Sequence, residues 1–375
     1  MEVGSGFRRV MNTYLIRGPC LTLEKLAMKK SLIALAVLTA SGISFAQSSV
    51  TMFGVVDAAY AKGTGSVSDK SQLKNSGYNS SRFGVRGTED LGGGLKASFW
   101  LEAGVNNDDG TGQAGSNNNQ AVGATDPVLN GRNQGLTFNR RSTVSLEGSF
   151  GEVRLGRDYT PQFWTETAFD PFGTNGVGTN IAFNKGGNTG IRASNSIGYL
   201  SPDFSGVKVW LQTYMGENAS TAPAKAGDGN AIRVSYDAGP LSLAYATSST
   251  TVSAGVKNDT SNIGASYAFS AVKVMAQINQ TKVDGAADID GYVVGATAPL
   301  GAGTVRFSLS ETDKAGAKSN QTAVGYVYGL SKRTDLYATY ARVTNKGGAN
   351  ASLNGSVTAA NASSSGYDFG IKHAF

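Results

Sequence analysis

Histidine and cysteine are almost absent from this chain of 375 residues, which contains one of each, and proline occurs only eight times. A disulfide framework needs paired cysteines and an imidazole metal site needs several histidines, so neither fits this composition. The single histidine, His373, lies two residues from the carboxyl terminus, and a catalytic nucleophile elsewhere would have no histidine base beside it. We therefore expect no catalytic residues, no metal site and no cofactor.

Long apolar runs are also missing, except for one near the amino terminus. Lys29 and Lys30 precede an apolar run over 32–38, and Ser44-Phe45-Ala46 offers small residues before Gln47. This order is typical of a secretory signal peptide, whereas a membrane-spanning helix needs about 20 apolar residues. We expect residues 1–27 to be an over-extended start or a leader, 28–46 to be a signal peptide, and 47–375 to be the mature domain.

The net charge of +6 depends largely on this amino-terminal segment. Residues 1–46 contain six of the 33 basic side chains and two of the 27 acidic ones, which leaves 27 against 25 in the mature chain. Cys20 is removed with the same segment. A nearly neutral mature chain gives no reason to expect nucleic acid as a partner, and basic side chains must be judged by their position.

Alternation of apolar and polar residues dominates the sequence after residue 47. Over 95–103, every second residue from Leu95 to Ala103 is apolar, while Lys96, Ser98 and Glu102 fall on the other face. Comparable segments occur sixteen times, and each predicts a strand with one apolar and one polar side. They are 50–60, 79–88, 94–104, 138–148, 151–158, 191–201, 206–215, 231–237, 240–248, 261–269, 271–281, 289–299, 303–311, 321–330, 334–344 and 366–375.

The connections between these strands alternate in length. Short turns such as 148–151 and 237–240 are followed by long stretches rich in Asn, Gly and Ser, such as 105–137 and 345–365. An even number of strands with turns at one end and loops at the other is typical of outer-membrane barrels, and closure leaves no strand edge unpaired in lipid. A secreted β-sandwich or β-helix would rarely end on an amphipathic strand with a terminal Phe375. We therefore predict an all-β fold, a transmembrane antiparallel 16-stranded β-barrel.

Several segments of the chain resemble a known family. The segments SSVTMFGVVDAAY, SRFGVRGTEDLGGGLKASFWLE, RRSTVSLEGSFGEVRLGRD, GIRASNSIGYLSPDFSGV and GIKHAF look like the general porins of β-proteobacteria, within the Gram-negative porin family. The similarity runs from about Ser48 to Phe375. It implies a homotrimer in the outer membrane of a Gram-negative bacterium, with an inward-folded third long loop and a water-filled channel for small hydrophilic solutes and ions. A substrate-specific channel for an organic acid, phosphate or sugar remains an alternative.

Strand parity selects the basic side chains of such a channel. Where Phe83 and Val85 point outward, Arg82 and Arg86 point into the lumen, and the same reasoning turns Arg141 and Arg192 inward. The resemblance implies a basic cluster at these motif positions, so we expect Arg82, Arg141 and Arg192 to form the basic side of the pore constriction. Arg140 could replace Arg141 after a β-bulge, and Arg86 is a further candidate. The alternative is that each arginine only keeps the lumen hydrated.

The acidic side of the constriction is expected from loop 159–190, whose Glu166 and Asp170 resemble the family's acidic loop. Glu102 and Asp57 are further candidates that could equally be simple wall residues. Because charges at a constriction set selectivity, the basic cluster predicts a preference for anions. A structural or adhesin barrel with a closed lumen is a weaker alternative, since three lumen arginines do not suit a dry plug.

Aromatic residues carry two further expectations. Phe375 and Tyr367, on the last strand, resemble an assembly signal read by the barrel assembly machinery. Tryptophan and tyrosine elsewhere are most simply interfacial aromatics, although parity turns Trp100 inward, below the constriction or toward the inward loop. Besides that machinery, the expected partners are outer-membrane lipid, lipopolysaccharide and two further copies of the chain.

Overall fold

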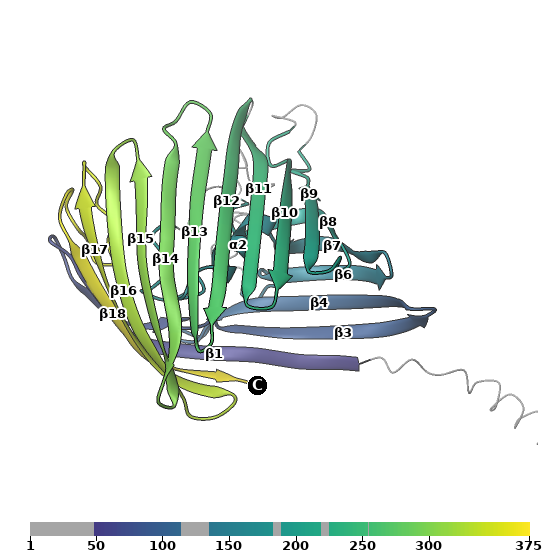
Figure 1. Ribbon diagram of the computed structural model, residues 1–375, viewed down its shortest axis with the longest axis horizontal. Helices are drawn as coiled ribbons and strands as arrows, with labels where there is room; N and C mark the ends of the chain where they lie inside the picture. The colour runs from purple at the N-terminus through teal and green to yellow at the C-terminus, as the bar shows by residue number, and fades with distance from the viewer. Residues whose placement is uncertain (1–48, 114–134, 183–188, 219–224, 254) are drawn as a thin grey trace, which may run out of the picture. The chain divides into compact units, whose positions relative to one another are not determined.

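The computed structural model of the protein describes residues 49–113, 135–182, 189–218, 225–253 and 255–375. The expected leader and signal peptide, 1–46, lie outside these residues. Most of the described chain forms antiparallel strands (Figure 1). Within the described ranges, no helix is both long and apolar enough to cross a membrane.

The elements follow one another with a single described helix. In chain order they are β1 (Ser49–Thr64), β2 (Lys70–Asn75), β3 (Arg82–Gly92), β4 (Leu95–Asn106), β5 (Thr111–Gly112), β6 (Arg141–Gly148), β7 (Gly151–Tyr159), α2 (Pro161–Ala168), β8 (Arg192–Leu200), β9 (Val207–Tyr214), β10 (Gly229–Ala238), β11 (Leu241–Ser253), β12 (Val256–Phe269), β13 (Val272–Val283), β14 (Ile289–Leu300), β15 (Gly303–Lys314), β16 (Ala317–Gly329), β17 (Thr334–Lys346) and β18 (Ser364–Ala374).

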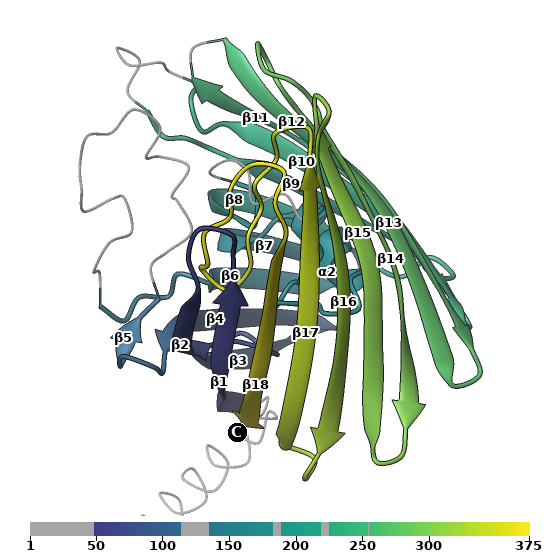
Figure 2. The same cartoon turned by 90° about the vertical axis from the view of Figure 1, so that its left-hand side faces the viewer.

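Strand pairing closes the sheet on itself. One edge of β1 pairs with β18, beside which it lies in Figure 2, and its other edge pairs with β2 and β3. The remaining strands pair antiparallel with their neighbours in chain order through to β17 and β18. β2 and β3 act as one interrupted strand, and the two-residue β5 only pairs with the last two residues of β4. The barrel therefore has sixteen strands, which confirms the predicted fold.

The two faces of the barrel differ in chemistry, as the alternation predicted. On β18, Tyr367, Phe369 and Ile371 are exposed on one face, whereas Ser364 and Asp368 are buried on the other. An apolar outer face suits contact with lipid, and a polar inner face suits a lumen. This arrangement follows from the period of two along a strand, because successive side chains point to opposite faces.

The connections are mostly arranged as predicted. At one end of the barrel every connection is short, such as 149–150 between β6 and β7, 270–271 between β12 and β13, and 301–302 between β14 and β15. Long connections occur at the other end, but three at that end are short, with two residues between β11 and β12, five between β13 and β14, and two between β15 and β16. The expected alternation of turns and loops therefore holds for most strands and not for these three hairpins.

The first connection differs from the prediction in its details. The second predicted strand, 79–88, starts at Arg82, and β2 precedes it without an alternating pattern, KSQLKN. The intervening residues 76–81 are held by the carboxylate of Asp57, which accepts hydrogen bonds from the backbone N–H groups of Gly77, Tyr78 and Asn79 at 3.3, 2.8 and 2.6 Å. A polar bend thus interrupts the strand, which alternation alone could not indicate.

Residues 160–182, with α2, contact the polar face of several strands. Phe169 packs against Gly264 of β12, Pro171 against Gly295 of β14, and Phe172 against Gly325 of β16. Each of the three glycines is buried and follows an exposed apolar residue, so all three lie on the polar register. Because glycine has no side chain, the wall leaves room for the bulky residues of this segment.

Candidate functional site

A large cavity of about 1230 Å³ is bounded by the polar face of the strands and by residues from segment 160–182. Its lining includes five arginines, which are Arg82, Arg140, Arg141, Arg192 and Arg306. Three carboxylates also line it, those of Glu102, Asp170 and Asp335. Four of the five predicted basic residues and two of the four predicted acidic residues therefore border one cavity.

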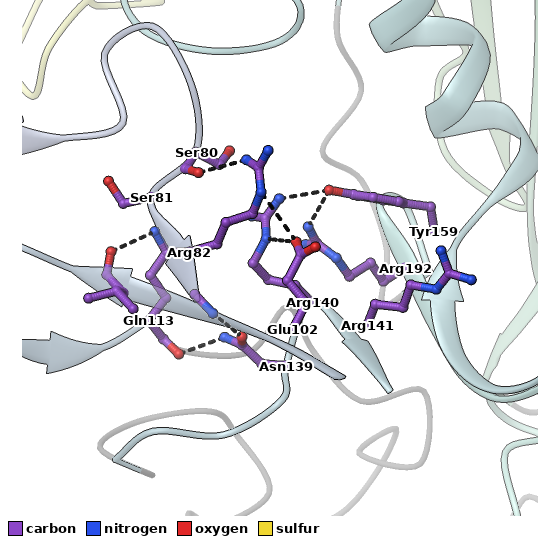
Figure 3. A network of polar contacts seen from close by, with 12 residues as sticks. Ser80, Ser81, Arg82, Glu102, Gln113, Asn139, Arg140, Arg141, Tyr159 and Arg192 are labelled. Atoms are coloured by element: carbon purple, nitrogen blue, oxygen red, sulfur yellow. Dashed lines mark hydrogen bonds and ion pairs between the residues drawn. The ribbon is translucent and has the colours of Figure 1, made fainter. Parts of the chain in front are cut away.

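Glu102 is the acidic centre of the arginine group (Figure 3). It lies on β4, and its Oε1 is 2.5 Å from Nε of Arg140 and 3.9 Å from Nε of Arg82. The indole N–H of Trp100 donates to its Oε2 at 3.1 Å. The side chains of Glu102 and Arg140 are both buried. Their close contact offsets part of the free energy that removing the two charges from water costs.

Arg140 enters the site just before β6. Its backbone N–H donates to the carbonyl of Glu102, and Arg141 pairs with Glu102 in the strand register. Both arginines nevertheless line the cavity. Arg140, the second choice, makes the closer contact to the Glu102 carboxylate.

The hydroxyl of Tyr159 joins two arginines from different parts of the chain. It accepts a hydrogen bond from Nη2 of Arg140 at 2.7 Å and from Nη2 of Arg192 at 3.0 Å (Figure 3). The guanidinium of Arg192 also lies over the Tyr159 ring, 4.5 Å from its centre. A phenol oxygen is a neutral acceptor, so it positions the two guanidinium groups without cancelling their charge.

Arg141 and Arg86 both contact the indole of Trp100. Their guanidinium carbons lie 4.6 and 4.8 Å from its ring, within the range of cation–π attraction. Nε of Arg141 is also 3.7 Å from Asp158. Arg86 does not border the cavity although its parity is correct, and Trp100 packs on the wall with Phe53 at 5.0 Å.

Asp170, one of the two acidic residues expected from the loop, lies at the cavity but is engaged by its own turn. Asp170 lines the cavity but is buried, and it accepts hydrogen bonds from the N–H groups of Phe172, Thr174 and Asn180 and from the Asn180 amide. Burial raises the pKa of this carboxyl, and those hydrogen bonds act in the opposite direction. Asp170 thus organises the turn after α2.

Glu166 and Asp57 are not among the residues that border the cavity. Glu166 lies on α2 and is 1% exposed, and Asp57 on β1 is fully buried. Asp57 is occupied by the 76–81 backbone and by the Tyr337 hydroxyl. These contacts indicate that Asp57 stabilises the barrel wall at the 76–81 bend.

Sequence reasoning missed two residues of the site, Tyr159 and Arg306. Parity could have found Arg306, because Phe307 and Leu309 are exposed outward and leave Arg306 and Ser308 buried on the inner register. No motif drew attention to it. Tyr159 ends β7, and only its position beside Arg140 and Arg192 reveals its role.

A closed sixteen-stranded barrel with an apolar outside and an arginine-lined polar cavity defines the class of outer-membrane channel proteins. The sequence pattern of the Gram-negative porin family matches residues 31–348. The chain therefore belongs to the Gram-negative porin family, as the sequence motifs predicted. It is an outer-membrane porin, a channel for passive diffusion, and its outer-membrane location follows.

Individual relatives agree with this family. Outer membrane porin protein 32 of Delftia acidovorans is 39% identical over 373 residues, covering 93% of this chain and 100% of the relative. An outer membrane porin protein of Bordetella pertussis is 28% identical, covering 83% of this chain and 93% of that relative. The solved anion-selective porin from Comamonas acidovorans superposes with a TM-score of 0.77 at 36% identity, covering 88% and 100%.

Proposed function

We propose that this porin is an anion-preferring channel whose constriction is formed by Arg82, Arg140, Arg141 and Arg192. On this proposal segment 160–182 folds into the lumen as the third long loop and forms part of the opposing side. The observation that carries the proposal is the single cavity in which five arginines meet three carboxylates.

Each of the three carboxylates of the cavity already has a partner within the protein. Glu102 contacts Arg140, Asp170 accepts four N–H hydrogen bonds, and Asp335 lies 2.7 Å from Nζ of Lys372. Of these three carboxylates, only that of Glu102 is paired with an arginine of the cavity, so the five arginines keep more net positive charge than a count of residue types suggests. At about 4 Å, unit charges interact by roughly 1 kcal/mol in bulk water and about 4 kcal/mol at an effective dielectric of 20, enough to bias which ion enters.

Two features of relatives support the proposal. The solved porin from Comamonas acidovorans is described as anion-selective and is 36% identical. One solved form of OmpT from Vibrio cholerae, similar in fold at a TM-score of 0.60 and 13% identity, is described as a trimer. We infer a homotrimer here as well, embedded in outer-membrane lipid and lipopolysaccharide after insertion by the barrel assembly machinery.

Reversal potentials in planar bilayers under a KCl gradient test the selectivity. The wild-type channel should favour chloride, and the triple variant R82Q/R141Q/R192Q should move the reversal potential toward cations with the barrel intact. A matched control, K257Q/K282Q/K318Q, removes the same number of positive charges from the outer register, outside the cavity, and should leave the potential unchanged. Cation selectivity of the wild type, or equal behaviour of the two triple variants, would refute the proposal.

A further inference from the structure

Arg306 on β15 is a buried cation without a described carboxylate partner. It is 7% exposed, its Nε has no hydrogen-bond partner, and no salt bridge to it occurs among the described residues. Burying an unpaired charge is costly. A buried guanidinium normally has a carboxylate in direct contact, whereas Asp170 and Asp57 act on Arg306 only from beyond ion-pair distance.

Aromatic rings fix the position of this guanidinium. Its Cζ atom is 4.7 Å from the centre of the Tyr78 ring and 4.7 Å from that of Phe172. Tyr78 belongs to the bend 76–81, and Phe172 belongs to segment 160–182. Cation–π contacts compensate part of the desolvation without neutralising the charge. Arg306 is thus held in place with its charge intact.

Arg306 lies across the barrel from β6 and β8, which carry Arg141 and Arg192. Along the closed order of sixteen strands, β15 is seven strands from β6 and seven from β8 by the shorter way round, and five strands from β3. It therefore belongs to the far wall of the lumen. Arg306 nevertheless borders the same cavity as Arg82 and Arg192.

The far wall was expected to be acidic, through Glu166 and Asp170. Glu166 does not border the cavity, and the Asp170 carboxylate is taken up by its own turn. Asp335 is paired with Lys372. The far wall thus includes a cation that no described carboxylate contacts, and an anion passing through the cavity would meet positive charge on both sides.

We propose that Arg306 is a specificity-determining residue, a second anion contact on the wall opposite the arginine group. The inference rests on the proposed anion preference and adds a particular residue to it. Permeating anions, such as halide, carboxylate or phosphate, would supply the close ion pair that no described carboxylate makes with Arg306. The charge of Arg306 matters for this role, and its stacking on Tyr78 and Phe172 provides the position.

The test compares R306Q and R306K in planar bilayers under KCl gradients, at low and high mean salt. R306Q should lower the anion-to-cation permeability ratio roughly twofold to fivefold, and less at high salt, because ions in the water-filled cavity screen the field that Arg306 exerts there. R306K retains the charge and should stay near the wild-type ratio. Two controls are F172L, which removes one ring but no charge, and K314Q, which removes a charge from the same strand outside the cavity.

The measurements distinguish a failure of the proposed anion preference from a failure of the role of Arg306. A cation-selective wild type would refute the proposed function itself. An anion-selective wild type whose ratio is the same in R306Q would refute only the role of Arg306. If R306Q, R306K and F172L all lower the ratio equally and at every salt concentration, Arg306 acts by packing the inward segment, and the proposed contact with anions is wrong.

Discussion

Nε of Arg140 and Oε1 of Glu102 lie 2.5 Å apart, and this contact joins the segment before β6 to β4 at the edge of the cavity. The same carboxylate is shared with Arg82 and Trp100. Glu102 therefore restrains the positive field of the arginine group while holding its members in place. Its removal should change selectivity in a direction opposite to the loss of an arginine.

E102Q should make the channel more anion-selective. The substitution removes one negative charge worth roughly 1 kcal/mol to a nearby ion in water, or about a fivefold change in permeability ratio. The amide can still accept from Trp100, so the wall should persist. Reversal potentials measure the effect, and E89Q on the exposed outer register of β3 is the matched control. A ratio unchanged or shifted toward cations in E102Q would contradict this role.

D57N should loosen the bend 76–81. An amide offers one acceptor oxygen in place of the two that bind the N–H groups of Gly77, Tyr78 and Asn79, and leaving a buried donor unsatisfied costs about 1–3 kcal/mol. Hydrogen exchange of residues 76–81 should accelerate in D57N while the strands stay protected. D259N, at an exposed site on β12, is the control. Unchanged exchange in the bend would show that the carboxylate is dispensable.

G264L should reduce single-channel conductance. A Cβ atom at position 264 would lie 2.6 Å from Cγ of Phe169, so the larger side chain must push the ring and the segment after α2 away from the wall and toward the cavity. Ala265→Leu adds a side chain to the opposite face of the same strand and should leave conductance unchanged. Equal conductance of G264L and the wild type would show that the segment yields without narrowing the channel.

Deletion of Phe375 should lower the amount of porin in the outer membrane more than it alters conductance per channel. The backbone of Phe375 exchanges two 3.1 Å hydrogen bonds with Gly54, which extend the closing pair β1 and β18, and its ring is half exposed. Surface levels measure assembly, and F369A removes an exposed aromatic from the same strand as a control. Normal surface levels of the deletion would rule out a terminal assembly signal.

Much of the fold could be predicted from alternation alone. The sixteen expected strands correspond to the sixteen strands of the barrel, because a period of two is a local property that each strand displays in its own sequence. β2 was missed for the same reason, since KSQLKN does not alternate although it pairs with β1, and the bend held by Asp57 follows it.

Parity also selected Arg82, Arg141 and Arg192, which all border the cavity, but it equally selected Arg86, which does not, and it left out Arg140, which does. What the sequence by itself could not decide is which charges balance one another. Glu102 contacts Arg140 from just before β6, Asp170 accepts hydrogen bonds from its own turn, and Arg306 contacts Tyr78 and Phe172 from distant parts of the chain. The face of a strand is fixed by neighbouring residues, whereas the partner of a charge depends on how the closed barrel and segment 160–182 bring remote residues within a few ångströms.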